Sequence, residues 1–138
     1  MTQKITEPFV KRAVKRYLDA KNYKEIDSRE LNEVGPDIVM KRRDNGRYII
    51  IEAKGESNAK SEMENKILNV IGQIVKRYTN RSNYYYGVAL PVTWKKRLPK
   101  KIGYDALKAL HLIIYLVDIN GNVEEISVRN YNKAFEVE

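Results

Sequence analysis

Two carboxylates and a lysine are the residues in this chain whose types and spacing could do chemistry together. Asp37 opens one apolar stretch, and Glu52 lies inside a second, two residues before Lys54. A carboxylate in such a run needs a positive partner, because burying an unpaired charge is costly. Mg²⁺ would serve, since it prefers oxygen ligands and keeps several of its waters. We therefore expect Asp37, Glu52 and the Ala53 backbone carbonyl to hold Mg²⁺, with Mn²⁺ as a substitute.

Lys54 lies on the same side of its strand as Glu52, because side chains alternate between the two faces. Its ammonium group could orient or deprotonate an attacking water, or stabilise the charge that develops on phosphorus. The alternative is structural, with Lys54 and Asp37 forming an exposed cross-strand ion pair. That alternative does not account for Glu52 within the apolar run 49–53, so the catalytic interpretation is favoured.

A tight turn is predicted to bring these residues together. The sequence Asp-Asn-Gly at 44–46 separates two strand-like segments, residues 37–43 and 47–54. Asn-Gly is the favoured pair for a two-residue type I′ hairpin turn. With that pair as the turn, Asp44 lies opposite Arg47.

Counting outwards from the turn sets the register of the hairpin. Asp37 then lies opposite Lys54, and Val39 lies opposite Glu52. This register puts the two carboxylates and the lysine on one face of the sheet. The other face must be core and carries the apolar side chains of Ile38, Met40, Ile49, Ile51 and Ala53.

The remaining pattern predicts an α/β protein with a mixed sheet flanked by helices. Its elements run in the order α-β-β-β-α-β, followed by α-β-β, and 138 residues suit one domain covering 1–138. Residues 28–36 are expected to form a loop, and the segment after Ser127 a peripheral tail. Besides the hairpin, helices are expected at 7–20, 61–80 and 104–110, and strands at 24–27, 84–90, 112–118 and 122–128.

Composition and charge favour an intracellular protein with a polyanionic partner. The chain contains 26 Lys and Arg against 18 Asp and Glu, a net charge of +8, and no cysteine. The absence of cysteine excludes a disulfide scaffold and a thiolate metal site. No apolar run approaches the ~18 residues of a membrane span, and the start of the chain does not resemble an export signal, so we expect no membrane association and a cytoplasmic location.

Basic side chains on two segments could contact DNA phosphates. One segment is the basic run after the strand at 84–90, and the other is the polar face of the helix at 61–80. A charge run can equally be a solvated face, so both readings stay open at this stage. The residues concerned are Lys95, Lys96 and Arg97 in the run, and Lys66, Lys76 and Arg77 on the helix.

The motifs GPDIV at 35–39 and IIIEAKGE at 49–56 resemble those of the PD-(D/E)xK nuclease superfamily. That superfamily includes type II restriction enzymes, archaeal Holliday junction resolvases and Mrr-like nucleases. The expected α-β-β-β-α-β order over residues 7–90 is similar to its restriction endonuclease-like core. The resemblance implies a magnesium-dependent deoxyribonuclease, an endonuclease that hydrolyses phosphodiester bonds in DNA.

The resemblance also implies further site residues and an assembly. Glu7 matches an extra ligand that several subgroups place on the first helix, although an acid there also suits a helix N-terminus. Gln73 matches a glutamine on the helix after the motif. In the RecB-like subgroup a tyrosine follows four residues later, where this chain has Arg77. Small relatives act as homodimers, so a homodimer is expected.

Three alternatives remain open at this point. The protein could be a Holliday junction resolvase, which would use the same catalytic residues on a four-way junction. It could be a catalytically inactive nucleic-acid-binding protein of the same fold. It could also be a subunit that needs a partner for specificity.

Overall fold

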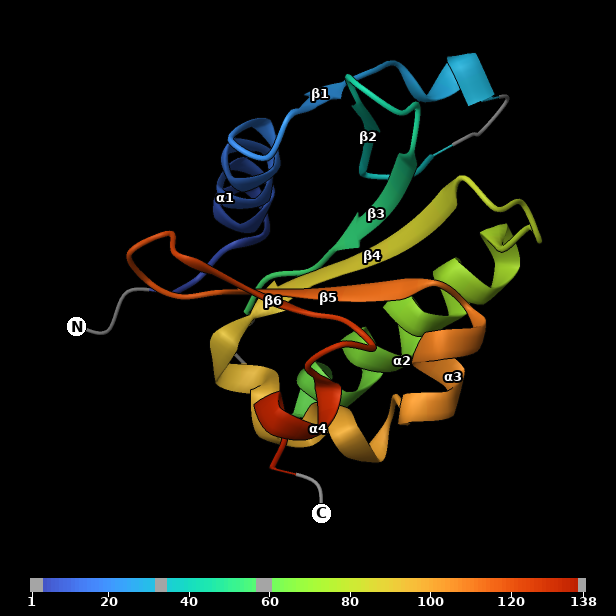
Figure 1. The fold of residues 1–138 in the computed structure, drawn as a ribbon. Coiled ribbons are helices and arrows are strands. Elements are labelled where there is room, and N and C mark those ends of the chain that lie inside the picture. Colours follow the sequence, from blue (N-terminus) through green and yellow to red (C-terminus); the bar gives the residue numbers. More distant parts are fainter. Residues whose placement is uncertain (1–3, 32–34, 57–60, 137–138) are drawn as a thin grey trace.

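A computed structural model describes residues 4–31, 35–56 and 61–136 of the chain (Figure 1). It shows a six-stranded mixed sheet flanked by helices, so the predicted fold class and element order are confirmed. The helices are α1 (Glu7–Asp19), α2 (Ser61–Arg77), α3 (Tyr104–Ala109) and α4 (Tyr131–Ala134), with 3₁₀ helices η1 (Ser28–Leu31) and η2 (Val92–Lys100). The strands are β1 (Tyr23–Glu25), β2 (Ile38–Arg42), β3 (Tyr48–Ala53), β4 (Tyr84–Pro91), β5 (Leu112–Val117) and β6 (Val123–Ile126).

The strands follow one another across the sheet in chain order. Strands β1, β2 and β3 are antiparallel neighbours, β3, β4 and β5 are parallel, and β6 returns antiparallel to β5. The two parallel pairs need helical crossovers, which α2 supplies between β3 and β4, and η2 with α3 between β4 and β5.

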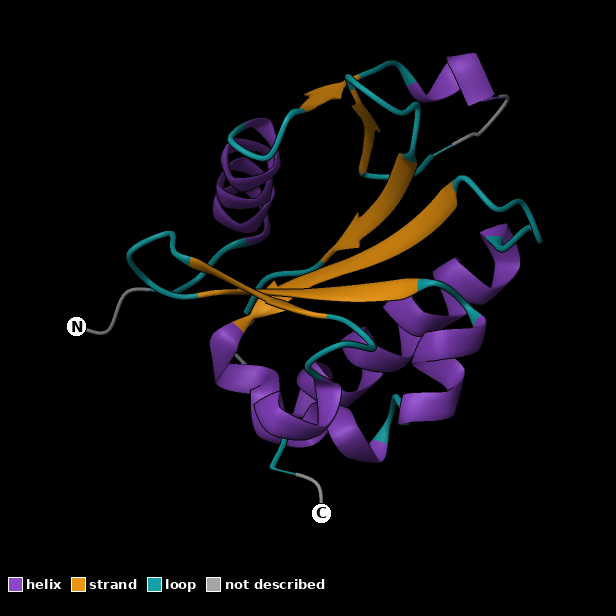
Figure 2. Ribbon diagram, viewed as in Figure 1, coloured by secondary structure: helices purple, strands orange, loops and turns teal. Residues whose placement is uncertain are grey.

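Helices cover both faces of the sheet (Figure 2). Helix α1 packs on one face through Val10, Ala13, Val14 and Leu18, whose helical spacing makes one apolar stripe. Helices α2, α3 and α4 lie on the other face (Figure 1). Side chains of β3 alternate between the two hydrophobic cores, because Ile49 and Ile51 point to α1 while Ile50 points to α2. No helix in the described part of the chain is long and apolar enough to cross a bilayer.

Three segments are more ordered than the sequence analysis expects, and the first is η1, which forms within the expected loop at 28–36. The basic run forms η2, because Trp94 and Leu98 are one helical turn apart and both are buried. The segment after Ser127 includes α4, so it is not wholly peripheral. Tyr131 of α4 is buried, and its hydroxyl donates to the Ile102 carbonyl at 2.6 Å. None of these three helical segments has a periodic pattern long enough to predict it from the sequence.

The predicted turn of the hairpin is wrong, although the assignment of faces survives. Arg42, not Asp44, lies opposite Arg47, with the Arg42 N–H donating to the Arg47 carbonyl at 2.8 Å. A type I′ turn needs positive φ at both central residues, but Gly46 has φ +70° and Asn45 is not in that region. The loop is therefore 43–46, and Asn45 caps it by accepting from the Arg47 N–H at 3.0 Å.

The longer loop shifts the register by two residues. Val39 lies opposite Ile50 instead of Glu52. Because the side-chain period of a strand is two, a shift of two leaves every side chain on its predicted face. The same register, continued one residue past β2, brings Asp37 opposite Glu52 instead of Lys54.

Candidate active site

Asp37 lies directly before β2, where its carboxylate is held by backbone and side chain together. Its Oδ2 atom accepts a hydrogen bond from the Ala53 N–H at 2.8 Å, and Oδ1 lies 3.2 Å from Lys11 Nζ on α1. The side chain is 22% exposed, so it remains open to solvent on one side. These contacts aim the carboxylate across the end of β2 towards β3.

Glu52 is the one charged side chain that is buried among the described residues, with 6% of its surface exposed. Its Oε1 atom accepts from Arg77 Nε at 2.7 Å. Burial raises the pKa of the Glu52 carboxyl to about 7, Arg77 opposes that rise, and the charge of Asp37 adds to it. The two carboxylates are therefore close enough for the charge on one to disfavour the charge on the other.

Lys54 follows the last residue of β3 and donates its backbone N–H to the Ala89 carbonyl at 3.0 Å. Continued alternation along the chain places its half-buried side chain on the Glu52 side. Within the described residues, Lys54 makes no ion pair with Asp37, which binds Lys11 instead. The structural alternative of a cross-strand Asp37–Lys54 pair is thus not what the structure shows.

The start of α1 is packed against the end of β3 at Gly55. A Cβ atom at this position would overlap the backbone of Thr6 and Glu7, so the close approach requires glycine. Glu7 is thereby brought near the carboxylates, but its Oε2 atom lies 3.4 Å from Lys11 Nζ. Lys11 stands between Glu7 and Asp37 as a shared cation.

Helix α2 supplies two basic side chains that contact β3 and the residue two positions after it. Lys66 Nζ donates to the Gly55 carbonyl at 3.1 Å, and Arg77, 12% exposed, reaches Glu52. Gln73 lies one turn before Arg77 and is exposed. The sequence analysis expects both basic residues on a DNA-facing surface, but Arg77 binds the Glu52 carboxylate and Lys66 binds the backbone carbonyl of Gly55.

Two site residues, Lys11 and Arg77, have contacts that the sequence analysis does not predict. Lys11 follows Glu7 by four residues, the spacing of a helical ion pair, which is a weak local signal. Arg77 occupies the position at which the RecB-like subgroup has a tyrosine. Its contact with Glu52 spans 25 residues of sequence, and no local pattern predicts it.

The other basic residues expected to contact DNA lie on the surface, and two of these four are in ion pairs. Lys95 contacts Glu124 at 3.0 Å, and Arg97 contacts Glu64 at 3.2 Å. Lys96 and Lys76 are exposed.

The residues at the end of β3 fit a magnesium ion held by few protein ligands. No group of three or more acidic, histidine or cysteine side chains gathers for a metal in the described ranges. Mg²⁺ nevertheless binds through one or two carboxylates and its own waters. Asp37 and Glu52 supply two carboxylates. The Ala53 carbonyl points to the same strand edge as its N–H, which donates to Asp37.

Comparison with known proteins supports the α/β fold of this chain and gives no information about its catalytic activity. No protein-family model matches the chain, and no curated protein matches it. A crystal structure of an XisH family protein from Nostoc punctiforme is similar, with a TM-score of 0.56 over 86% of this chain and 99% of that one. The two sequences are 15% identical, so this likeness concerns the α/β architecture alone.

Proposed function

We propose that this chain is a magnesium-dependent endonuclease that hydrolyses phosphodiester bonds in DNA. The observation that carries the proposal is the pairing of the Asp37 carboxylate with the buried carboxylate of Glu52. Two acids held together at the end of a strand, one of them buried, are costly to ionise unless a cation joins them. The net charge of +8 supports a polyanionic substrate.

Four residues at the end of β3 would have distinct roles in this reaction. Asp37 and Glu52, with the Ala53 carbonyl, would hold Mg²⁺, and the ion would supply Lewis acidity to the phosphodiester and its attacking water. Lys54, next on the Glu52 side, would orient that water or stabilise charge on phosphorus. The Ala53 N–H fixes the Asp37 carboxylate in place.

Arg77 and Lys11 have a positioning role in this proposal. Each holds one carboxylate, Arg77 that of Glu52 at 2.7 Å and Lys11 that of Asp37 at 3.2 Å. Both cations offset the repulsion between the acids and keep them aligned in the metal-free protein. Glu7, which is paired with Lys11, and Gln73, one helical turn before Arg77, would complete the site.

The same ion pairs favour one competing function, a nucleic-acid-binding protein without catalysis. If Lys11 and Arg77 satisfy the two carboxylates permanently, the site needs no metal and the acids are structural. The competing functions differ in metal binding, which can be measured without any substrate. The proposed homodimer and the choice between duplex and junction rest on the resemblance to small nucleases.

The test combines metal binding and cleavage. Calorimetric titration with Mn²⁺ should show saturable binding to the wild-type protein that Asp37→Asn and Glu52→Gln abolish. Glu25→Gln serves as a matched control, since Glu25 is an exposed strand glutamate paired with Lys15. With Mg²⁺ or Mn²⁺, the wild type and the control should cut plasmid or junction DNA, whereas Ca²⁺ should support binding alone.

A lysine variant separates the chemistry from metal binding. Lys54→Met should keep Mn²⁺ affinity but slow cleavage by about a hundredfold or more, the scale of losing a charge-stabilising group. DNA binding without Mn²⁺ binding in the folded wild type would favour the non-catalytic function. Cleavage of junctions but not of linear duplex would assign a resolvase.

A further inference from the structure

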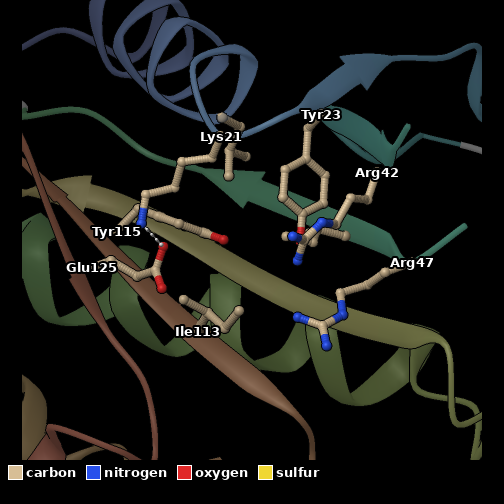
Figure 3. A pocket seen from close by; sticks show the side chains of 9 residues that line it. Lys21, Tyr23, Arg42, Arg47, Ile113, Tyr115 and Glu125 are labelled. Carbon is tan, nitrogen blue, oxygen red and sulfur yellow. Dashed lines mark ion pairs between the residues drawn. The ribbon is translucent and has the colours of Figure 1, made fainter. Parts of the chain in front are cut away.

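A basic pocket lies on the α1 face of the sheet, the face away from Glu52. It has a volume of about 370 Å³, within the size of small-molecule sites. The side chains come from the end of α1 and from strands β1, β2, β3, β5 and β6 (Figure 3). The lining residues are Leu18, Lys21, Tyr23, Arg42, Arg47, Ile49, Ile113, Tyr115 and Glu125.

Two arginines face each other across the hairpin at this pocket. Arg42 and Arg47 are direct cross-strand partners, and like charges in that position destabilise a sheet. Neighbouring groups offset the repulsion between the two arginines only in part. Arg42 Nε lies 2.8 Å from Asp44 Oδ1 without hydrogen-bond geometry, and the Arg47 guanidinium lies 4.3 Å from the centre of the Tyr85 ring. An anion between the two guanidinium groups would relieve the repulsion.

The pocket also contains buried polar atoms that make no hydrogen bond, although one of them, Arg42 Nε, is ion-paired with Asp44. In the described part of the chain, two buried side-chain polar atoms have no hydrogen-bond partner, Tyr115 Oη and Arg42 Nε, and both residues line this pocket. Figure 3 shows the Tyr115 hydroxyl aimed between the Lys21–Glu125 pair and the two arginines. A buried hydroxyl without a partner is costly, so its presence indicates a group that completes it.

From these contacts we infer that the basic pocket binds the phosphate group of a small organic phosphate monoester. A monoester is a dianion near neutral pH and matches two guanidinium groups, which bind phosphate in forked geometry. Lys21 is already paired with Glu125 at 3.7 Å, so the arginines provide the main phosphate contacts. The hydroxyl of Tyr115 would donate to a phosphate oxygen that enters between the two arginines.

The organic part of the ligand has its own surface in the pocket. Ile113, 9% exposed, and the ring of Tyr23, 6% exposed, form a small apolar wall in front of the buried Leu18 and Ile49. A planar group such as a nucleobase would bury apolar area there. A neighbouring hollow of about 560 Å³ shares Arg42, Arg47, Ile113 and Glu125, which leaves room for a ligand longer than phosphate alone.

The test uses calorimetric titration of the full chain with inorganic phosphate and with deoxyadenosine 5′-monophosphate. Both should bind saturably, the nucleotide more tightly. Arg42→Gln and Arg47→Gln should each weaken binding by about tenfold or more, the loss of a charged hydrogen bond. Arg43→Gln is the matched control, because Arg43 is a neighbouring arginine that pairs with Asp19 outside the pocket, and it should bind as the wild type does.

Tyr115→Phe separates a ligand-binding hydroxyl from a merely structural one. This variant keeps the buried ring and removes an unpaired group, so the free protein should be at least as stable as the wild type. Its nucleotide affinity should fall by roughly threefold or more. Unchanged affinity in this variant and both pocket arginine variants would overturn the inference, as would no saturable binding to the wild type.

One more arm distinguishes the source of the phosphate. A short oligonucleotide without terminal phosphate carries phosphodiesters alone, each with a single charge. It should fail to displace the nucleotide, whereas the same oligonucleotide with a 5′-phosphate should compete. Equal displacement by both would overturn the assignment to a monoester and make the pocket a contact for the DNA backbone.

Discussion

Replacing Glu52 by glutamine should make the metal-free protein more stable above neutral pH and leave its stability unchanged in acid. Burial raises the pKa of Glu52 from 4.5 to about 7 in the folded protein, against the attraction of Arg77. Between these values the folded state holds a proton that the unfolded state has released. The free energy of unfolding therefore falls as the pH rises through this window, because the unfolded state binds fewer protons there.

The magnitude follows from the same two pKa values. Their difference corresponds to roughly 3 kcal/mol of lost stability once Glu52 is fully ionised. Glutamine resembles the protonated acid and does not ionise. Glu52→Gln should thus gain up to about 3 kcal/mol over the wild type at about pH 8, and nothing at about pH 4.

Urea denaturation at several pH values, with a chelator present, measures this difference. Glu25→Gln is the control, because Glu25 is an exposed glutamate of the same sheet and its variant should follow the wild-type curve. Parallel stability curves for the wild type and Glu52→Gln between about pH 4 and pH 8 would refute the argument that buried Glu52 is costly to ionise. So would a glutamine variant that is less stable in alkali.

Three further predictions each concern a single residue. Gly55→Ala should destabilise the fold by at least about 2 kcal/mol, because its Cβ would overlap the backbone at the start of α1. Gly72→Ala is the control and should not destabilise the fold, because its Cβ meets nothing within 4 Å. Equal denaturation midpoints for the two variants would contradict this prediction. Tyr131→Phe should lower the free energy of unfolding by about 1–2 kcal/mol in urea denaturation, because it leaves the Ile102 carbonyl without its hydrogen bond. Unchanged stability would contradict this prediction. Lys96→Glu should weaken DNA binding and reduce its salt slope by about 0.9, and an unchanged slope would move the DNA surface elsewhere.

Much of the architecture follows from local patterns in the chain. The apolar spacing of α1 and α2, the apolar runs of β3, β4 and β5, and the Asn-Gly turn signal predict the element order that the structure shows. These signals are local, because helical and strand periods repeat within a few residues. The face assignment of Asp37 and Glu52 survives the wrong turn, since a shift of two residues does not change the face of a side chain.

The surroundings of those carboxylates were decided by tertiary packing. Lys11 and Arg77 reach them from two helices on opposite faces of the sheet, and Gly55 sets the distance of α1 from β3. The basic pocket likewise joins α1 to five strands. By itself, the sequence determined which residues share a strand face or a helical stripe, because that depends on backbone period. The packing of the layers decided which side chains meet across elements, because contacts between residues distant in the chain have no local pattern. It also decided how deeply Glu52 is buried and therefore how far its pKa is raised.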